Sequence, residues 1–484
     1  MEDYIIAIDL GTYQTRIVAA QYDEKKLFKL NVIYKETQNS KGIRRGVIYD
    51  TENCAKVVNN LIMGAEKRLG DIKTSGEAAK AKRKKTYYLC VGLAGLAYTT
   101  STIKASVDVG ERVSNNTIEE LEGKVKSIID QNTKDEEALI HMSTISYSID
   151  NEPETLDVEG KRANSIMGKY LYQTIRRTYA TDINNVFANA SSTTNRVKPH
   201  KSMPTAEAKG NILLLPSMKN EGVALVDIGE GCVDVAVYYG GTLRNVVSIP
   251  LGSYTITKDI ATALDIEDEN TARLWKEKIG IVDKDVLDKT FELEMKNGNT
   301  KSISAAEFSF VVKARTEELI AYVDSAIQEH KRHIQTIVLT GAGSRLNNIC
   351  DMFVERTGIN TILSESHLTE IDDATLQNYA GSLGLAQTMA FERHEDLMGK
   401  QTVVDNAKET AKQQNEQSVV SEAQKPIEEQ ETSNTNYATS TDTTAQPKQE
   451  TESIENRPKG FWGKVFGGIK KNFDDVLLND YSTD

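Results

Sequence analysis

Two short segments of this chain repeat one plan, in which an apolar strand-like run ends in Asp-x-Gly and a second apolar run follows. They are Ile8-Asp9-Leu10-Gly11-Thr12 and Val226-Asp227-Ile228-Gly229-Glu230-Gly231. Glycine permits a tight turn and lets backbone N–H groups approach anionic oxygens. A carboxylate at a strand end can hold Mg²⁺ directly or through water. The pair predicts two facing hairpins that clamp a triphosphate with its magnesium ion.

The candidate ligands in these hairpins follow from that chemistry. Asp9 and Asp227 are the candidate magnesium ligands, although an aspartate that only caps a turn is the alternative for each. The predicted nucleotide contacts in the two turns are Asp9, Gly11, Thr12, Asp227, Gly229 and Gly231.

A third glycine-rich turn follows another apolar run, Ile337 to Leu339, and precedes a predicted helix that begins near Leu346. Unhindered backbone at a helix start suits the ribose or a phosphate of a nucleotide. The turn adds Gly341 and Gly343 to the predicted nucleotide contacts, although an ordinary α/β turn would look the same.

Composition limits the classes of protein that this chain can belong to. Its 484 residues exceed what one hydrophobic core usually serves, and strand-like runs alternate with helical patterns, so we expect an α/β protein of two or more domains. A net charge of −13 argues against a nucleic-acid partner. The four cysteines are far apart, which argues against a disulfide framework or a zinc site. Neither a secretory signal nor a run of about 20 apolar residues is found, and a cytoplasmic protein is expected.

The last ninety residues change character twice. Residues 392–457 are polar and nearly free of large apolar side chains, so we expect a disordered linker. Apolar residues then return at helical spacing over 458–480, with lysines mainly off that stripe, which predicts an amphipathic helix for an anionic membrane surface. Docking of this helix in a groove of a partner or of its own body is the alternative. The predicted membrane-binding residues are Phe461, Trp462, Val465, Phe466, Ile469, Lys470 and Phe473.

Taken with the two hairpins, several segments resemble the actin/Hsp70/sugar-kinase superfamily and, within it, the FtsA family of bacterial cell-division proteins. These segments are Val226 to Val237, Gly240 to Arg244, Ile256 to Ala261, Ile337 to Gly341 and Tyr379 to Leu385. The resemblance implies an actin-like two-domain fold with a small inserted subdomain in the first half. The implied boundaries are 1–85 and 169–205 for the first domain, 86–168 for the insertion and 206–391 for the second domain.

The resemblance also implies a function. An FtsA-like chain would bind ATP with magnesium, assemble with itself into filaments and tether the tubulin-like GTPase FtsZ to the cytoplasmic side of the membrane at the division site. It would recruit later division proteins and would be at most a weak ATPase. The FtsZ contact would lie at about residues 265–331.

Three residues depart from the family pattern. The second phosphate motif of the family usually reads D-I-G-G-G-T, whereas this chain has Glu230 and Cys232. Near the expected adenosine contact Lys276 matches the family, but Arg273 replaces an acid. Either Glu230 lies close to the phosphates and repels them, or it turns away and changes nothing. We therefore expect a nucleotide site, with Lys276 as a further contact, and weak or absent turnover.

Other proteins of this superfamily are the alternatives. A sugar or acid kinase would need a catalytic aspartate and a substrate pocket between the domains. An Hsp70-like chaperone would need a β-sandwich domain where this chain has a polar segment. A pilus-assembly homologue would lack the terminal helix.

Overall fold

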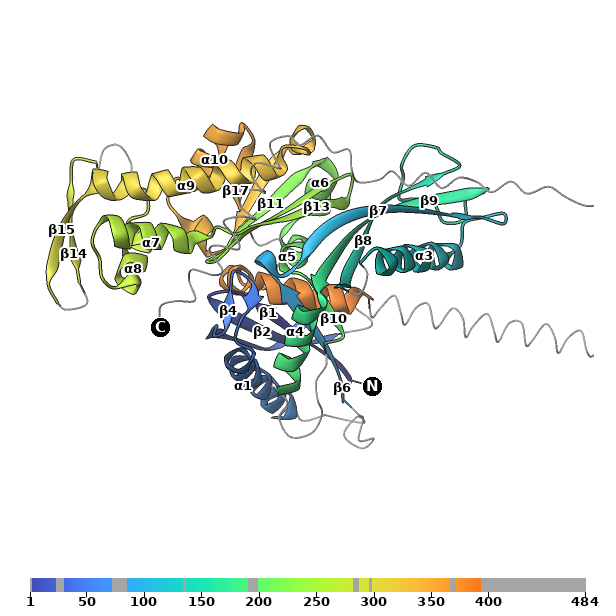
Figure 1. Cartoon of the computed structure of the whole chain (residues 1–484), viewed down its shortest axis with the longest axis horizontal. Helices are drawn as coiled ribbons and strands as arrows, with labels where there is room; N and C mark the ends of the chain where they lie inside the picture. Colours follow the sequence, from blue (N-terminus) through green and yellow to red (C-terminus); the bar gives the residue numbers. More distant parts are fainter. Residues whose placement is uncertain are drawn as a thin grey trace, which may run out of the picture. The chain divides into compact units, whose positions relative to one another are not determined.

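The computed structural model describes residues 2–22, 30–71, 85–133, 136–189, 199–281, 287–295, 298–365 and 371–392. The expected linker at 392–457, apart from residue 392, and the expected amphipathic helix at 458–480 lie outside these residues. The described part contains two five-stranded sheets, one three-stranded sheet and two small hairpins (Figure 1). No helix in these ranges is both long enough and apolar enough to span a bilayer.

The first sheet has the strand order β10-β6-β1-β2-β3. Strands β1, β2 and β3 are antiparallel neighbours, whereas β6 pairs in parallel with β1, and β10 in parallel with β6. The bounds are β1 Glu2–Leu10, β2 Gln14–Tyr22, β3 Leu30–Asn39, β6 Lys85–Leu93 and β10 Lys201–Pro204, with a small hairpin of β4 Ile43–Arg44 and β5 Val47–Ile48 beside it.

The second sheet repeats this plan with the order β13-β12-β11-β16-β17. Three antiparallel strands are again followed by two strands that run parallel to the first of them. The bounds are β11 Val223–Ile228, β12 Val233–Tyr239, β13 Thr242–Ile249, β16 Thr336–Thr340 and β17 Asn360–Leu363. The internal repeat that the two sequence motifs predicted is therefore a repeat of whole sheets.

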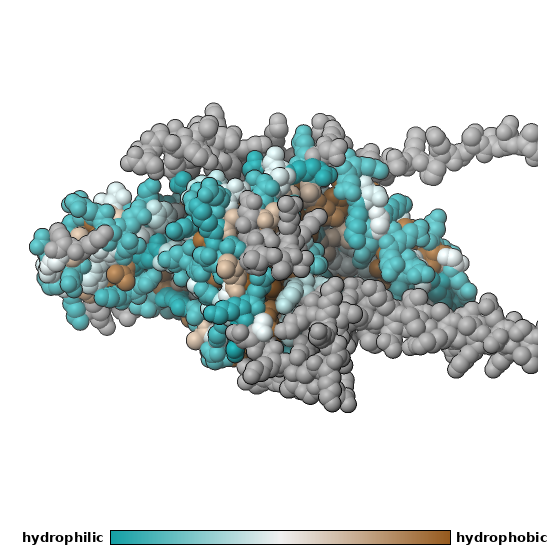
Figure 2. All heavy atoms as spheres, turned by 90° about the horizontal axis from the view of Figure 1, so that it is seen from below, coloured by the Kyte–Doolittle hydropathy of each residue, from teal (hydrophilic) through white to brown (hydrophobic). Residues whose placement is uncertain are grey.

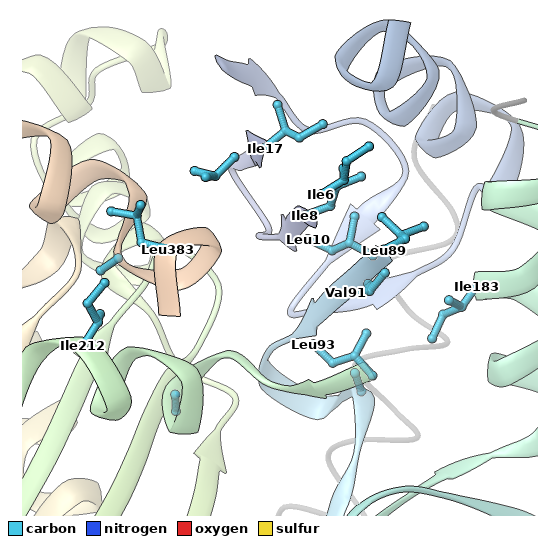
Figure 3. Close-up of a cluster of buried hydrophobic side chains, with 14 of the residues drawn as sticks. Ile6, Ile8, Leu10, Ile17, Leu89, Val91, Leu93, Ile183, Ile212 and Leu383 are labelled. Carbon is cyan, nitrogen blue, oxygen red and sulfur yellow. The ribbon is translucent and has the colours of Figure 1, made fainter. Parts of the chain in front are cut away.

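Alternating apolar residues place the strands of the first sheet between two layers of side chains. Ile6, Ile8 and Leu10 of β1 face one side with Leu89, Val91 and Leu93 of β6 (Figure 3). Ile5 and Ala7 face the opposite side. The apolar residues of α1 and α4 pack in the larger of these cores. The helices of this half are α1 Thr51–Asp71, α4 Arg177–Asn189 and α5 Thr205–Leu213.

Strand β11 of the second sheet is buried along its whole length, as a continuous apolar run predicts for a strand covered on both faces. Ala224, Val226 and Ile228 pack in one core, while Val223 and Leu225 belong to the core shared with the first sheet. Helices α7 and α9 lie side by side against this half (Figure 1). Its helices are α6 Pro216–Glu221, α7 Ser253–Ala263, α8 Glu269–Ile279, α9 Ala305–Ile327 and α10 Ile349–Thr357, and the hairpin of β14 Thr290–Glu294 and β15 Thr300–Ser304 precedes α9.

The three-stranded sheet has the order β7-β9-β8 and is covered by α3. Leu121, Val125 and Ile129, spaced by four residues on α3, form with this sheet a core of their own. The bounds are β7 Thr99–Asp108, α3 Asn115–Thr133, β8 Glu137–Ile149 and β9 Ser165–Arg176.

The expected insertion boundaries, 86 and 168, do not coincide with this sheet. Residue 86 falls in β6, which is a strand of the first sheet, and residue 168 falls inside β9. The three-stranded sheet runs from Thr99 to Arg176. The difference arises because a short apolar run predicts a strand without saying which sheet it joins.

A last helix over 373–392 joins the two cores of the first half. Leu376, Ala380 and Leu383 pack in the larger core, and Figure 3 shows Leu383 beside Ile212 of α5. Leu385 and later residues pack with Ile5 on the opposite side of the sheet. On the face shown in Figure 2, hydrophilic residues cover most of the described surface.

Candidate functional site

The two predicted hairpins are β1–β2, called the first hairpin, and β11–β12, called the second hairpin. Asp9 is the next-to-last residue of β1, and Asp227 is the next-to-last residue of β11. The parallel neighbour of Asp9 is Gly92 of β6, and that of Asp227 is Thr340 of β16. The two aspartates thus hold equivalent places in two equivalent sheets.

The turns of the two hairpins meet. A side chain at Gly231 would place its Cβ 2.7 Å from Thr12 Oγ1, so only glycine fits beside Thr12. Thr12 Oγ1 also accepts a hydrogen bond from the backbone N of Gly46 at 3.1 Å. In the first turn, a Cβ on Gly11 would lie 2.6 Å from the carbonyl oxygen of Gln14. The structure therefore brings Thr12 and Gly231 together, and each turn is closed too tightly for a larger residue.

Asp227 is buried and is held by a lysine that the sequence did not single out. Lys209 Nζ, on α5, donates to Asp227 Oδ2 at 2.5 Å, and both side chains are largely buried. The other oxygen of Asp227, Oδ1, is buried without a hydrogen-bond partner among the described residues. One oxygen of this carboxylate thus remains available to a ligand.

Asp9 is also buried, but its hydrogen bond comes from a hydroxyl group and not from an ammonium group. Thr205 Oγ1, at the start of α5, donates to Asp9 Oδ1 at 3.1 Å. Gly381 of the last helix packs so closely that a Cβ there would lie 2.5 Å from Asp9 Oδ2. Burial raises the pKa of Asp9, while the nearby charges of Lys209 and Arg16 act in the lowering direction.

The third glycine-rich turn lies beside Asp227. Gly341 has a φ of +86°, and a Cβ at this position would lie 2.5 Å from Asp227 Oδ1 and equally near the carbonyl oxygen of Ile228. At Gly343 a Cβ would lie 2.3 Å from Ile228 Cγ2. Both glycines are therefore required by the close approach of this turn to the second hairpin.

Lys276 is buried on α8, but its ammonium is engaged within the protein. Its Nζ donates to the backbone oxygen of Ser253 at 2.9 Å. Burial lowers the pKa of this lysine, and the nearby Glu230 acts in the raising direction. Lys276 thus ties α8 to the start of α7, where the backbone N of Ser253 donates to the backbone oxygen of Gly229 in the second turn at 2.9 Å.

The two charged departures from the family pattern pair with each other. Arg273 Nη2 donates to Glu230 Oε1 at 2.7 Å, and Ser253 Oγ donates to Glu230 Oε2 at 3.1 Å. The guanidinium carbon of Arg273 also lies 4.2 Å from the centre of the Tyr13 ring in the first turn. The sequence left two alternatives for Glu230, close to the phosphates or turned away from them. In the structure its carboxylate is turned to α8, where Arg273 neutralises it.

Cys232 lies buried behind the second turn. Burial and the nearby Asp234 raise the pKa of its thiol, so the neutral form is favoured. A reactive thiolate role for this residue has no support in the geometry.

The site fits a nucleotide with magnesium by the chemistry of its donors. Buried Asp227 Oδ1 lacks a partner, two turns admit only glycine, and two carboxylates lie near enough to interact electrostatically. Among the described residues, no cluster of three or more His, Cys, Asp or Glu side chains could hold a metal alone. Magnesium commonly takes one or two carboxylates and completes its shell with water and phosphate oxygens.

A cavity of about 720 Å³ lies elsewhere, lined by residues of β8, α4, β10 and the last helix. None of the predicted nucleotide contacts lines it. The predicted membrane-binding residues, Phe461 to Phe473, lie outside the described residues. The site residues that sequence reasoning missed are Tyr13, Thr205, Lys209 and Ser253. Tyr13 lies in the first turn itself, whereas only the fold brings the other three to the hairpins.

The family model and the curated relatives that match this chain are of one family. A family model described as "Cell division protein FtsA" matches residues 224–441. Cell division protein FtsA of Bacillus subtilis (strain 168) is 23% identical over 328 residues, which cover 67% of this chain and 69% of the relative. Cell division protein FtsA of Escherichia coli (strain K12) is 23% identical over 399 residues, or 79% of this chain and 89% of the relative.

A solved structure supports the fold. The chain matches a "PilM-PilN type IV pilus biogenesis complex" with a TM-score of 0.55 at 12% identity, covering 80% of this chain and 98% of that one. The expected actin-like two-domain fold, with its insertion, is confirmed at the level of architecture.

Proposed function

Because this chain is a relative of the FtsA cell-division proteins, we propose that it is a division scaffold that binds ATP with magnesium and links FtsZ filaments to the membrane. The observation that carries the nucleotide part is the meeting of two equivalent hairpins, each with a buried aspartate at its strand end. The last segment of the sequence carries the membrane part. The cell-division role rests on the relatives.

The nucleotide would be held by the residues that the two hairpins and the third turn provide. Asp9 and Asp227 would hold magnesium directly or through water. The small turn residues would offer backbone N–H groups to phosphate oxygens, and Gly341 and Gly343 would lie at the ribose or a phosphate. The turn residues that would contact the phosphates are Gly11, Thr12, Gly229 and Gly231. Lys276 would act indirectly, because its bond to Ser253 holds α8 in place.

Titration of the purified full-length chain with ATP and Mg²⁺ by calorimetry tests this site. We expect saturable binding and slow steady-state release of phosphate. Absence of binding at millimolar ATP would reduce the fold to a scaffold without nucleotide, and fast phosphate release would contradict weak turnover.

The membrane part rests on the spacing of apolar residues in 458–480. Seven of them fall on one helical face, and lysines lie mainly off that face. Each lysine near an anionic leaflet contributes about 1 kcal/mol, and filaments would present many such helices at once. The protein would therefore lie peripherally on the cytoplasmic side of the membrane, at the division site.

Co-sedimentation of FtsZ with anionic liposomes tests the tether. We expect FtsZ to pellet with liposomes only when the full-length chain is present, and to stay in solution when residues 458–484 are deleted. Trp462→Lys with Phe466→Lys should abolish pelleting of the chain itself.

A matched control adds the same two charges to the polar side of the predicted helix. Gly467→Lys with Gly468→Lys should pellet at least as well as the unchanged chain. Equal pelleting of both double variants would contradict the membrane role of the apolar face. If the chain pellets with liposomes but FtsZ stays in solution, the FtsZ link is contradicted and the membrane role is not.

Filament formation and recruitment of later division proteins complete the proposal, and the FtsZ contact is proposed at 265–331. Electron microscopy of the full-length chain on lipid with ATP would show filaments. A small-molecule kinase would instead give a phosphorylated product in a screen of sugars and acids, and we expect none.

A further inference from the structure

Arg273 is the one residue of α8 described so far that reaches both hairpins. Its Nη2 donates to Glu230 of the second turn at 2.7 Å, and its guanidinium carbon lies 4.2 Å from the ring centre of Tyr13 in the first turn. The side chains of Arg273 and Glu230 are only 16% and 14% exposed. This cation is therefore held where the two phosphate-type turns meet.

Two of the nitrogen donors of Arg273 form no hydrogen bond within the described residues. Its Nε and Nη1 are buried and have no acceptor among the described residues. A buried charged donor without an acceptor costs free energy of folding. We therefore expect a ligand to supply the acceptor. The neighbouring cation on the same helix, Lys276, already donates to the backbone of Ser253.

The acceptor that suits these donors is a phosphate oxygen. Guanidinium groups bind phosphate with charge-assisted hydrogen bonds and tolerate burial better than ammonium groups do. The two turns beside Arg273 are only partly buried, and Tyr13 of the first turn is 43% exposed.

Glu230 is the counter-ion of Arg273 in this arrangement. Its carboxylate also accepts from Ser253 Oγ, and its backbone oxygen accepts from the N of Tyr254 at 2.9 Å. The carboxylate neutralises Arg273 and competes electrostatically with any phosphate that approaches it. Removing its charge should therefore strengthen anion binding.

We propose that Arg273 binds the phosphate groups of the nucleotide directly and that Glu230, as its counter-ion, weakens this binding. The proposal rests on the nucleotide site proposed above and assigns to that site a cation and a regulator of affinity. The two charged departures from the family pattern are then a matched pair, in which Arg273 binds phosphate and Glu230 weakens that binding.

A double-mutant cycle with the full-length chain tests the proposal. The variants are Arg273→Gln, Glu230→Gln and both together, and calorimetry measures binding of Mg-ATP, tripolyphosphate and adenosine. We expect Arg273→Gln to weaken ATP and tripolyphosphate binding at least about tenfold without changing adenosine binding. Glu230→Gln should tighten binding of both anions by roughly three- to tenfold, and the double variant should stay weak.

Two controls separate the contact from a loss of folding. Lys278→Gln removes an exposed cation from the same helix and should leave all three affinities unchanged. Arg273→Lys keeps the charge and should recover part of the anion affinity. The melting temperature and far-ultraviolet circular dichroism of every variant should show a folded protein.

The outcomes are distinct. If the double variant binds ATP as tightly as Glu230→Gln, Arg273 only neutralises Glu230 and the proposal is overturned. An equal loss of adenosine and ATP affinity in Arg273→Gln would overturn phosphate recognition. Binding of tripolyphosphate, but of neither ATP nor adenosine, to the unchanged chain would remove the nucleotide function and leave the anion contact standing. Binding of no probe would overturn both.

Discussion

Asp9 and Asp227 occupy the same place in two sheets of the same strand order, yet the two halves surround them with different charges. Across the first hairpin, Asp9 faces Arg16. Across the second, Asp227 faces another carboxylate, Asp234. Opposite charges across a ladder are favourable and like charges are not. The second half therefore needs a cation from outside its hairpin, and α5 supplies it as Lys209.

This difference teaches that a repeated backbone does not imply a repeated electrostatic design. The first aspartate has a cation, Arg16, opposite it in its own hairpin and a hydroxyl donor, and Lys209 is also near enough to act on it. The second depends on one buried lysine and is followed by a second ion pair, Glu230 with Arg273. Four substitutions break or sharpen the contrast, and they follow from the largest expected effect to the smallest.

Lys209→Ala should give the largest loss of stability, about 3–5 kcal/mol, because it leaves Asp227 buried without its cation. Urea unfolding followed by circular dichroism measures this loss. Lys209→Met combined with Asp227→Asn removes both charges and should recover most of it. A loss no greater than that of Thr205→Val would contradict the dependence of the second half on this ion pair.

Gly341→Ala should cost about 2–4 kcal/mol, because its φ of +86° disfavours a side chain and the new Cβ would meet Asp227. Gly381→Ala is the matched change in the first half, since its Cβ would meet Asp9 at the same 2.5 Å. Gly381 lies in a helix, where alanine is favoured over glycine. The melting temperature should therefore fall further for Gly341→Ala, and the reverse order would contradict the role of backbone conformation.

Asp234→Asn should remove a pH dependence of stability. Burial above all, together with the charge of Asp227, raises the pKa of Asp234 to about 7 from an ordinary value of 3.8. The folded protein therefore keeps a proton that the unfolded chain has lost, so stability falls as pH rises from about 4 through 7. Unfolding free energies at pH 5 and pH 8 should show the unchanged chain losing on the order of 1–3 kcal/mol relative to the variant. Parallel pH profiles would contradict the protonated aspartate.

Thr205→Val should have the smallest effect, about 1 kcal/mol, because it removes one hydrogen bond to Asp9. Thermal unfolding measures the change. Thr316→Val, on α9, removes a buried hydroxyl that bonds only to its own helix and is the control for the substitution itself. A loss of several kcal/mol at Thr205 alone would show that Asp9 depends on its neighbour as strongly as Asp227 does.

Local patterns predicted the strands that carry the two aspartates and the strand and helix around the third turn. The apolar runs before Asp9 and Asp227 are β1 and β11, the run Ile337 to Leu339 lies in β16, and the helix expected to begin near Leu346 is α10, which begins at Ile349. These patterns work because burial imposes a period of two on strands and of 3.6 on helices.

Pairing over long sequence distance could not be predicted. Strand β6 was expected to open the insertion, but its partner is β1, some eighty residues earlier. Glu230 and Arg273 lie 43 residues apart, and nothing local in the sequence links them. Lys209 could not be predicted for the same reason, because its bond to Asp227 depends on α5 lying beside the second hairpin.

The last helix has a mechanical consequence. Glu392 ends it and forms an ion pair with Lys201 of β10, while Gly384 packs against the backbone of Ala208 and Gly381 against Asp9. Tension applied to the chain beyond residue 392 would load this helix along its length. The load would pass through Gly381 to the carboxylate of the first hairpin, so a pull on the chain beyond residue 392 would act on the site.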